Sequence, residues 1–457
     1  MHLHLHVLGL SGTFMSAMAL LARDLGHTVT GSDAQCYPPV SDLLKAKGIT
    51  WTEGYEDYQV ALEADLIIVG NAMKRGMPVL EKILEMGKPY TSGPQWLAEH
   101  VLSRYQVIAI AGTHGKTTTT SMTAWILEKA GMNPGFLIGG VAPAFNTSAQ
   151  LGSGTFFIIE ADEYDSAYFD KRPKFMHYRP HIAVLNNLEF DHADIYPDLA
   201  AIEQQFHYLV KTIPPNGLVL KPRDDIALNK VLDRGLYSRV EDMAIEGKAD
   251  WTAQLLDESG QNFKVFYHGE ELTQVQWPLI GRFNVENGLS AIAASVHAGV
   301  DPKIAADALN QFLPVKRRLE LKYELNGISV YDDFAHHPTA IFKTVEALKA
   351  SKRHQRIFVV MEFASYTMRS GVHVHDMAKA LALVDGAYIL EPQDFNIYEV
   401  LKDLSCVYKI CKNNHEIVLE VQSNLKPGDA ILVMSNRSFN GIHQQLIDVL
   451  EMMTCLK

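Results

Sequence analysis

The segment Val107-Ile108-Ala109-Ile110-Ala111-Gly112-Thr113-His114-Gly115-Lys116-Thr117-Thr118 decides how the middle of this chain folds. Its apolar half predicts a buried strand, and the stretch from Ser121 to Lys129 predicts a helix beyond the Gly-rich turn. Free N–H groups and the dipole at a helix start favour phosphate oxygens. A lysine in such a turn can reach the β/γ-phosphates, and the next hydroxyl can bind Mg²⁺. The segment therefore predicts a nucleotide-binding loop made of Gly112, Thr113, His114, Gly115, Lys116, Thr117 and Thr118.

This loop is shorter than the common phosphate loop, because Ile110 stands where that pattern has its first glycine. Two neighbouring apolar segments, Thr155 to Ile159 and His181 to Leu185, also end in polar residues. In open parallel sheets, ligands lie beyond the carboxyl ends of the strands. We therefore expect three strand ends to meet around one nucleotide, with a carboxylate and an imidazole near Mg²⁺. Solvated acidic loops are the alternative. The polar runs are Glu160-Ala161-Asp162-Glu163-Tyr164-Asp165 and Asn186-Asn187-Leu188-Glu189-Phe190-Asp191-His192.

Upstream, the chain begins with a strand, a glycine turn and a helix. Leu3 to Gly9 runs into Gly9-Leu10-Ser11-Gly12, a helical stretch from Thr13 to Leu25 follows, and the next strand ends at Asp33. This order is typical of a nucleotide-binding βαβ unit, although the turn lacks the full Gly-x-Gly-x-x-Gly fingerprint. His2, His4 and His6 alternate along the first strand and so share one face. We expect a partly solvated strand face there, with a metal site as the less favoured alternative.

Downstream of Pro314, the chain again alternates strands and helices. Lys316-Arg317-Arg318 precedes a strand from Ile328 to Tyr331, which leads into Asp332-Asp333-Phe334-Ala335-His336-His337-Pro338. Arg318 and this loop either close over the nucleotide or form a solvated edge. Further strands are expected at Arg356 to Met361, Ala387 to Leu390 and Asp429 to Met434.

Length and composition limit the classes of protein. The 457 residues suggest about three domains, and a formal net charge of −12 argues against nucleic acid or an anionic membrane as partner. No Cys-x-x-Cys pair occurs among the four cysteines, which predicts neither a zinc ribbon nor disulfides and favours a reducing compartment. The N-terminus lacks the pattern of a signal peptide, and no apolar run is long enough to span a bilayer. We therefore expect a cytoplasmic protein.

The Gly112–Thr118 loop, the Glu160–Asp165 run and Asp191-His192 together resemble the Mur ligase superfamily, ATP-dependent amide-forming enzymes of cell-wall synthesis. Asp333-Phe334-Ala335-His336-His337-Pro338 is similar to the branch that acts on UDP-N-acetylmuramate. Within it, the resemblance is greatest to ligases that add the tripeptide L-alanyl-γ-D-glutamyl-meso-diaminopimelate. It implies an α/β fold of three domains: residues 1–103 for the UDP-sugar, a P-loop-type ATPase domain at 104–313, and a Rossmann-like domain at 314–457. A monomer or homodimer is expected.

The resemblance also implies roles for particular residues. Lys116, Glu160 and His192 are the expected catalytic residues, and Thr117, Glu160 and His192 the expected ligands of Mg²⁺. ATP, the second substrate, is expected to contact the Gly112–Thr118 loop together with Asn284, Asn287, Arg318, Asp333 and His336. The expected contacts of UDP-N-acetylmuramate are Gly9, Ser11, Gly12, Thr13, Asp33 and Asn71.

This sequence departs from the superfamily pattern in several places. Phe283 stands where relatives have a metal-associated histidine, and no lysine lies between Ala193 and Val210 to be carbamylated. Ala364 replaces an expected arginine, and Arg437 replaces a usual glycine. The last two put the contacts with the peptide in question.

Three alternative functions stay open. One is a ligase that adds free L-alanine to UDP-N-acetylmuramate, against which the extra segment Asp170 to Tyr178 and the missing arginine at Ala364 argue. Another is a folate-type polyglutamate ligase, which would lack the separate N-terminal Gly-x-x-Gly domain. A nucleotide-binding sensor with degenerate catalysis is the third, and it would explain the departures.

Overall fold

The Gly-rich loop follows β6 (Gln106–Ala111), a strand in the interior of a ten-stranded sheet. The computed structural model describes residues 2–371, 374–393 and 396–455. The strand order is β17-β16-β15-β14-β13-β12-β6-β9-β7-β8. Strands β12 (Ile182–Leu185) and β9 (Phe156–Glu160) flank β6 and run parallel to it. The three polar strand ends therefore lie at one edge of the sheet, as predicted.

The rest of the central segment completes this sheet and covers its faces. The other strands are β7 (Gly135–Ala142), β8 (Thr147–Gln150), β13 (Leu218–Pro222), β14 (Arg239–Ile245), β15 (Trp251–Leu255), β16 (Asn262–Tyr267) and β17 (Glu270–Gln276), with a separate hairpin of β10 (Asp165–Ala167) and β11 (Asp170–Pro173). The helices are α6 (Lys116–Lys129), α7 (Leu199–Lys211), α8 (Ile226–Asp233), α9 (Arg282–His297) and α10 (Pro302–Asn310).

Helix α6 begins at Lys116, so the predicted start at Ser121 is wrong. Threonine is a poor helix former because it is branched at Cβ, and Thr117 to Thr120 therefore favour a later start. In the folded chain all four threonines are buried. The hydroxyl of Thr119 also donates to Oδ1 of Asn287 on α9, at 3.2 Å. Packing of α6 against α9 therefore overrides the intrinsic preference of these residues.

The N-terminal segment forms a parallel five-stranded sheet with the order β3-β2-β1-β4-β5. Its elements are β1 (His4–Leu8), α1 (Thr13–Asp24), β2 (Thr28–Asp33), α2 (Val40–Ala46), β3 (Thr50–Glu53), α3 (Gln59–Glu63), β4 (Leu66–Val69), α4 (Pro78–Glu85), β5 (Tyr90–Ser92) and α5 (Gly93–His100).

The alternating histidines of β1 are paired with hydroxyl groups of β2. His2 and His4 contact Thr28 and Thr30 at 3.0 and 2.8 Å, and His6 contacts Thr30 and Ser32, both at 2.9 Å. Exposure falls along the strand, from an exposed His2 to a buried His6. Burial, with a smaller effect of the neighbouring His4, lowers the pKa of His6 to about 4. The three imidazoles therefore form a cross-strand hydrogen-bond ladder on one face.

The C-terminal segment forms a six-stranded sheet with the order β18-β19-β23-β20-β21-β22, in which only β18 is antiparallel among the described strands. Its elements are β18 (Glu320–Leu325), β19 (Ile328–Asp333), α11 (Pro338–Ala350), β20 (Arg356–Glu362), α12 (Tyr366–Arg369), α13 (Val374–Ala380), β21 (Gly386–Leu390), α14 (Ile397–Leu401), β22 (Val407–Cys411), α15 (Asn414–Asn424), β23 (Asp429–Met434) and α16 (Ile442–Cys455).

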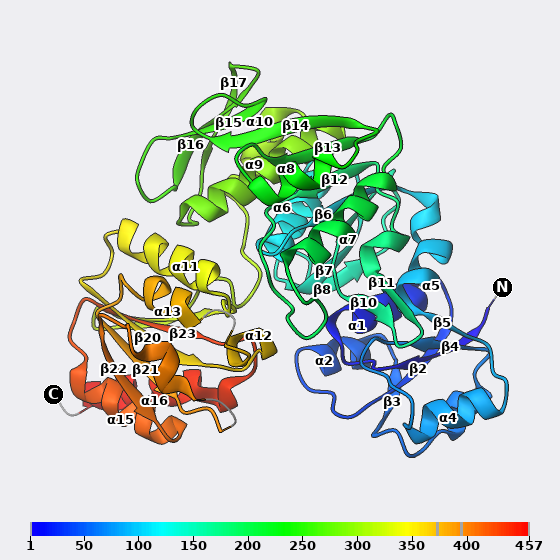
Figure 1. Cartoon of the computed structure of the whole chain (residues 1–457), viewed down its shortest axis with the longest axis horizontal. Helices are drawn as coiled ribbons and strands as arrows, with labels where there is room; N and C mark the ends of the chain where they lie inside the picture. The colour runs from blue at the N-terminus through cyan, green and yellow to red at the C-terminus, as the bar shows by residue number, and fades with distance from the viewer. Residues whose placement is uncertain (1, 372–373, 394–395, 456–457) are drawn as a thin grey trace.

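The predicted α/β fold with three domains is confirmed, and the domains pack unequally (Figure 1). One apolar cluster joins the first two sheets, since it contains Leu5 of β1 as well as Val107 of β6. The C-terminal sheet has apolar clusters on its own two faces, to which the central segment contributes Ile280. The predicted boundaries near residues 103 and 313 stay predictions. Within the described ranges, no helix has the length and apolarity needed to cross a membrane.

Candidate functional site

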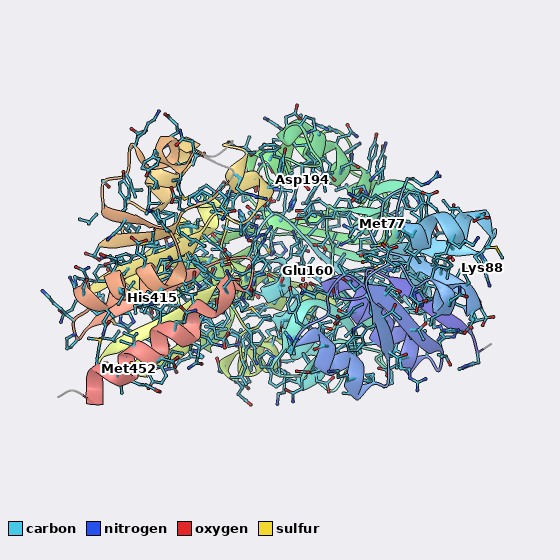
Figure 2. The ribbon with its side chains drawn as sticks, turned by 90° about the horizontal axis from the view of Figure 1, so that it is seen from below. Met77, Lys88, Glu160, Asp194, His415 and Met452 are labelled. Carbon is cyan, nitrogen blue, oxygen red and sulfur yellow. The ribbon has the colours of Figure 1, made fainter. Side chains whose placement is uncertain are left out.

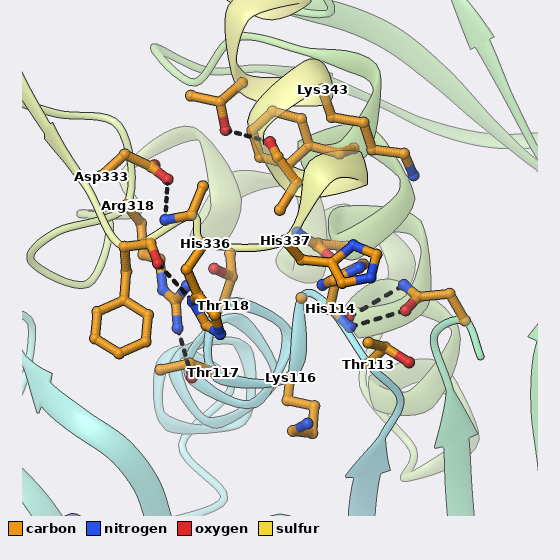
Figure 3. A pocket seen from close by; sticks show the side chains of 18 of the residues that line it. Thr113, His114, Lys116, Thr117, Thr118, Arg318, Asp333, His336, His337 and Lys343 are labelled. Carbon is orange, nitrogen blue, oxygen red and sulfur yellow. Dashed lines mark hydrogen bonds between the residues drawn. The ribbon is translucent and has the colours of Figure 1, made fainter. Parts of the chain in front are cut away.

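A cavity of about 250 Å³ opens at the Gly-rich loop, between the central and C-terminal sheets (Figure 3). Its wall comes from stretches that are far apart in the sequence, among them the loop itself, the polar runs after β9 and β12, the start of α9 and the segment from β19 into α11. The predicted nucleotide and catalytic residues in this wall are Thr113, His114, Gly115, Lys116, Thr117, Thr118, Glu160, His192, Asn284, Asn287, Arg318, Asp333 and His336. Gly112 does not line the cavity, but its carbonyl oxygen accepts a hydrogen bond from Lys116 at 2.7 Å.

Lys116 is held by a carboxylate to which the sequence assigned no role. Its ammonium group lies 3.1 Å from Oε2 of Glu163, and Nε2 of His192 lies 2.9 Å from Oε1 of the same residue. Burial disfavours the charged form of Glu163, but Lys116 and His192 lower its pKa to about 2. Glu163 in turn raises the pKa of both Lys116 and His192 against the effect of burial. One buried carboxylate therefore holds both Lys116 and His192 in place at the wall of the cavity.

A second carboxylate, Glu160, contacts the helix start. The hydroxyl of Thr117 donates to Oε1 of Glu160 at 2.9 Å, and the backbone N–H of Gly139 donates to Oε2 at 2.7 Å. Burial raises the pKa of Glu160, and the nearby Asp162 raises it further. A cation beside this carboxylate would offset the effects of burial and of Asp162 on its pKa. Hydroxyl and carboxylate oxygens are the ligands that Mg²⁺ prefers, so Thr117 and Glu160 fit that ion.

The fit of His192 to the same ion is less direct. Its Nε2 faces Glu163, and its backbone has a left-handed φ of 57°. Its ring lies against that of Tyr164, with 4.2 Å between the centroids. The role of His192 as a metal ligand stays a prediction, since its Nε2 is paired with the Glu163 carboxylate.

The C-terminal sheet contributes a cation that reaches across to the loop. A terminal nitrogen of Arg318 donates to the hydroxyl of Thr117 at 3.2 Å, and its guanidinium lies 5.1 Å from the ring centroid of Phe334. Asp333 is used locally, because its carboxylate accepts from the backbone N–H groups of Leu319 and Ala335 at 2.6 and 2.7 Å. Burial raises the pKa of Asp333 to about 6 although Arg318 opposes the shift. Arg318 thus faces the nucleotide loop, and Asp333 shapes the segment that carries it.

The far wall of the cavity comes from the start of α9. Asn284 donates from Nδ2 to the carbonyl of Ile280 at 2.8 Å, while Asn287 accepts from Thr119. Phe283 also lines the cavity, so the position where relatives have a histidine offers a ring face instead of a ligand. This wall therefore combines an aromatic ring with two amide side chains.

A second cavity of about 240 Å³ lies between the N-terminal and central sheets and shares part of the wall of the first. Three of the residues predicted to bind the UDP-sugar line it, namely Gly12, Thr13 and Asn71, and the shared wall is Glu160, Asp162 and Tyr164. In Figure 2, Glu160 lies near the middle of the molecule, between the N-terminal and C-terminal domains. The other three, Gly9, Ser11 and Asp33, do not line this cavity. Asp33 accepts from the backbone N–H of Ser11 at 2.8 Å and fixes the glycine turn.

A third cavity of about 700 Å³ lies in the C-terminal domain. Ala364, where an arginine was expected, and Arg437, where a glycine was expected, both line this cavity. The two departures from the expected pattern therefore face the same space. The other charged groups around it are Glu362, Arg369, Glu391, Lys412 and His415, of which His415 is labelled in Figure 2. A wall with both signs of charge suits a ligand that carries carboxylates and an amine.

The sequence did not single out several residues of these cavities. Glu163 lies in a run that we quoted, but nothing in the run distinguishes it from Glu160. Lys174 lines the second cavity with its ammonium group 3.3 Å from Asp162, and it is nearly buried. Lys174 falls inside the segment Asp170 to Tyr178, which we noted only as an extra segment. The available signal was a lysine directly after β11, the strand that pairs with the end of the Glu160–Asp165 run. Glu189 and His337 also approach the loop, at His114.

Comparison with known proteins covers the whole chain. It matches "Mur ligase family, catalytic domain" at residues 4–105, "Mur ligase middle domain" at 110–295 and "Mur ligase, glutamate ligase domain" at 317–437. The UDP-N-acetylmuramate–L-alanyl-γ-D-glutamyl-meso-2,6-diaminoheptandioate ligase of Escherichia coli K12 is 48% identical over 451 residues, which cover 98% of each chain. The ligase of that name from Haemophilus influenzae is 46% identical over 453 residues, or 98% of this chain and 99% of the relative. A crystal structure of murein peptide ligase from Psychrobacter arcticus is similar with a TM-score of 0.77, at 43% identity and 98% coverage of both chains.

Proposed function

This chain belongs to the Mur ligase family, and we propose that it joins UDP-N-acetylmuramate to the tripeptide L-alanyl-γ-D-glutamyl-meso-diaminopimelate at the expense of ATP. The relatives that are 46% and 48% identical are named for this activity, and each aligns with this chain over nearly its whole length. The reaction is an ADP-forming amide ligation. Because it consumes ATP, we place it in the cytoplasm. In this proposal residues 1–103 bind the UDP-sugar and residues 104–313 bind ATP. Residues 314–457 close over the site and bind the peptide.

The observation that carries the proposal is the wall shared by the first two cavities. A carboxylate is a poor electrophile, and transfer of the γ-phosphoryl group of ATP converts it to an acyl phosphate with a good leaving group. That transfer requires the muramate carboxylate and the γ-phosphate to meet. Glu160, Asp162 and Tyr164 line both cavities, so ligands in the two spaces approach one another at these residues. Positioning of this kind provides most of the catalysis in phosphoryl transfer.

The residues of the first cavity suit the charge that develops in this step. We assign Lys116 to the β/γ-phosphates and Arg318 to the same phosphates from the C-terminal side, since both cations face the loop. Thr117, Glu160 and His192 would hold Mg²⁺, which neutralises phosphate charge when bound. The amine of the peptide has an ordinary pKa of about 7.7 to 8, so much of it is already neutral near pH 8. Attack on the acyl phosphate therefore needs no dedicated strong base.

We place the peptide in the third cavity, the one lined by Ala364 and Arg437. Its cations suit the carboxylates of the diaminopimelate end, and Glu362 and Glu391 suit the amine at that end. On this assignment, Arg437 supplies from the end of β23 the guanidinium that Ala364 at the end of β20 no longer provides. The departures from the family pattern then compensate one another.

The acceptor is tested by incubating the protein with ATP, Mg²⁺ and UDP-N-acetylmuramate and adding either the tripeptide or L-alanine. We expect phosphate release and a product of the ligated mass with the tripeptide. Release with L-alanine alone would replace this proposal by the L-alanine ligase. Nucleotide binding without ADP formation, whichever acceptor is offered, would favour a sensor.

Lys116→Ala tests the catalytic assignment. We expect a loss of turnover on the order of 10² to 10³-fold, because a charge that stabilises the transferring phosphoryl group is removed. Lys171→Ala is the matched control, since Lys171 is largely exposed and pairs with Asp165. A folded Lys116→Ala protein that releases ADP at the normal rate would contradict the assignment.

A further inference from the structure

Three side chains meet beside the Gly-rich loop, at the edge of the first cavity. They are His114 of the loop, Glu189 beyond β12 and His337 at the start of α11, and they come from both the central and the C-terminal domain. One ligand atom from each lies within 4.8 Å of the other two. Figure 3 shows the two histidines side by side, and their ring centroids are 4.7 Å apart. None of the roles proposed above uses Glu189 or His337.

The distances match those around a tetrahedral ion. Nε2 of His114 lies 3.2 Å and Nδ1 of His337 lies 3.4 Å from the same oxygen, Oε2 of Glu189. Zinc binds nitrogen and oxygen at about 2.0–2.1 Å, and two ligands of a tetrahedral ion at that distance are about 3.3–3.4 Å apart. The three side chains therefore need little movement to bind one ion.

The hydrogen bonds of His337 fix the orientation of its ring beside Glu189. The backbone N–H of Thr339 donates to Nδ1 at 3.3 Å, which makes His337 the N-cap of α11, while Nε2 lies 3.3 Å from the carbonyl of Phe190. Nδ1 must be unprotonated to accept, so Nε2 carries the proton and donates to Phe190. A neutral imidazole oriented by a backbone carbonyl is the usual form of a metal-bound histidine.

Glu189 is in the form that binds a cation. Burial opposes its ionisation, but the hydrogen bond from His114 outweighs burial and lowers its pKa to about 2. Nδ1 of His337 lies 3.4 Å from the same carboxylate oxygen, and His337 also lowers the pKa of Glu189. A cation bound between these atoms would replace the hydrogen bonds that His114 and the backbone N–H of Thr339 now make.

We propose that His114, Glu189 and His337 form a site for one transition-metal cation of the Zn²⁺ class. Two imidazoles and one carboxylate with an open fourth position match the ligand set of several zinc enzymes. The nitrogen ligands distinguish this site from the oxygen-rich pair of Thr117 and Glu160, which suits Mg²⁺. His114 and His337 both line the nucleotide cavity, so the open position faces it. An ion here links the Gly-rich loop to α11 and thereby the central domain to the C-terminal domain.

The experiment is a Co²⁺ titration of the nucleotide-free, full-length protein in excess Mg²⁺, followed by visible absorption and then by displacement with Zn²⁺. We expect one equivalent of Co²⁺ with the spectrum of a nitrogen-bound tetrahedral ion. Glu189→Gln and His337→Asn should each weaken binding at least about tenfold. Asparagine is chosen for position 337 because it preserves the N-cap of α11. Circular dichroism verifies that both variants fold.

His336→Gln is the matched control, since this neighbouring imidazole lines the same cavity but is not part of the cluster. It should bind Co²⁺ like the unaltered protein, and Zn²⁺ should raise the melting temperature of both. Unaltered Co²⁺ affinity in Glu189→Gln would overturn the site. Loss of binding in Glu160→Gln alone would overturn it too and place the ion at the Thr117–Glu160 pair. Ligase activity with Mg²⁺ as the only metal is measured separately, so failure of this site and failure of the proposed function are distinguishable.

Discussion

The ammonium group of Lys116 lies 3.1 Å from a carboxylate oxygen of Glu163, and both side chains are almost buried. The other oxygen of that carboxylate faces His192. A phosphate that enters the cavity therefore meets a lysine whose position is already fixed. Such preorganisation avoids the cost of orienting charges during the reaction.

Glu163→Gln should lower the pKa of His192. Burial lowers that pKa and the Glu163 carboxylate is the main group that raises it, so an amide leaves burial and the charge of Lys116 opposed only by Asp191. NMR titration of the imidazole signals measures the change. Asp165→Asn is the control, because Asp165 lies in the same run but pairs with Lys171. A His192 pKa that stays raised in Glu163→Gln would contradict this account.

The same pair should make the free energy of unfolding depend on pH. The pKa of Glu163 is lowered from 4.5 to about 2, so its contribution is present above 4.5 and is lost as the pH falls toward 2. The pKa of His192 is raised from 6.5, so its contribution is present below 6.5 and is lost as the pH rises through the raised value. Urea unfolding of the unaltered protein and Glu163→Gln should therefore differ most between about pH 4.5 and 6.5. An equal difference from pH 3 to 9 would be inconsistent with the linkage.

Lys174→Ala should raise the KM for UDP-N-acetylmuramate by about tenfold or more, because a charge-assisted hydrogen bond is worth about 1.5–3 kcal/mol. Lys174 lines the second cavity, and its side chain is only 10% exposed. Lys171→Ala serves as control from the preceding strand β11, since that side chain is 71% exposed. Steady-state kinetics with ATP saturating gives both values. Equal KM values in the two variants would remove Lys174 from the sugar site.

Arg437→Gly should raise the KM for the tripeptide by about tenfold and leave the KM for ATP unchanged, since Arg437 lines the third cavity and not the first. Glycine is the residue that relatives usually have at this position. Lys402→Ala, an exposed substitution at the end of α14 in the same domain, is the control. If the tripeptide KM does not change, the acceptor binds elsewhere.

Gly115→Ala should destabilise the protein more than Gly131→Ala does. Both glycines have left-handed backbones, with φ of 82° and 72°, and they flank the two ends of α6. A Cβ at Gly115 would lie 2.3 Å from Oδ1 of Asn287, whereas one at Gly131 would meet nothing within 4 Å. We expect about 1 kcal/mol for Gly131→Ala from the backbone alone, and at least about 1 kcal/mol more for Gly115→Ala. Equal midpoints in urea would mean that Asn287 moves aside without cost.

Local signals in the sequence predicted the strands that lead into the first cavity. The apolar strands that end at Ala111, Glu160 and Leu185 were predicted to within one or two residues, because each is a short apolar run followed by polar residues. The parallel sheet then brings their ends together without further information. The antiparallel strands β15, β16 and β17 carried no such signal, since their exposed faces interrupt the apolar pattern.

Pairings between the loops could not be predicted. Glu160 and Glu163 are three residues apart in one acidic run, and only the path of the loop decides that Glu160 meets Thr117 while Glu163 meets Lys116. The cluster of His114, Glu189 and His337 depends on contacts across more than two hundred residues. Such contacts are set by domain packing and leave no periodic mark on the chain.

The wall that the first two cavities share, Glu160, Asp162 and Tyr164, also matters for inhibition. A single molecule with a nucleotide at one end and a muramyl group at the other would need only a short tether to occupy both spaces. Binding of one end then presents the other at a high effective concentration, so two weak fragments can give a tight inhibitor. The tether would need to match the thickness of the single layer of side chains between the two cavities. Its length would therefore set the selectivity of the inhibitor for ligases whose two cavities share a wall.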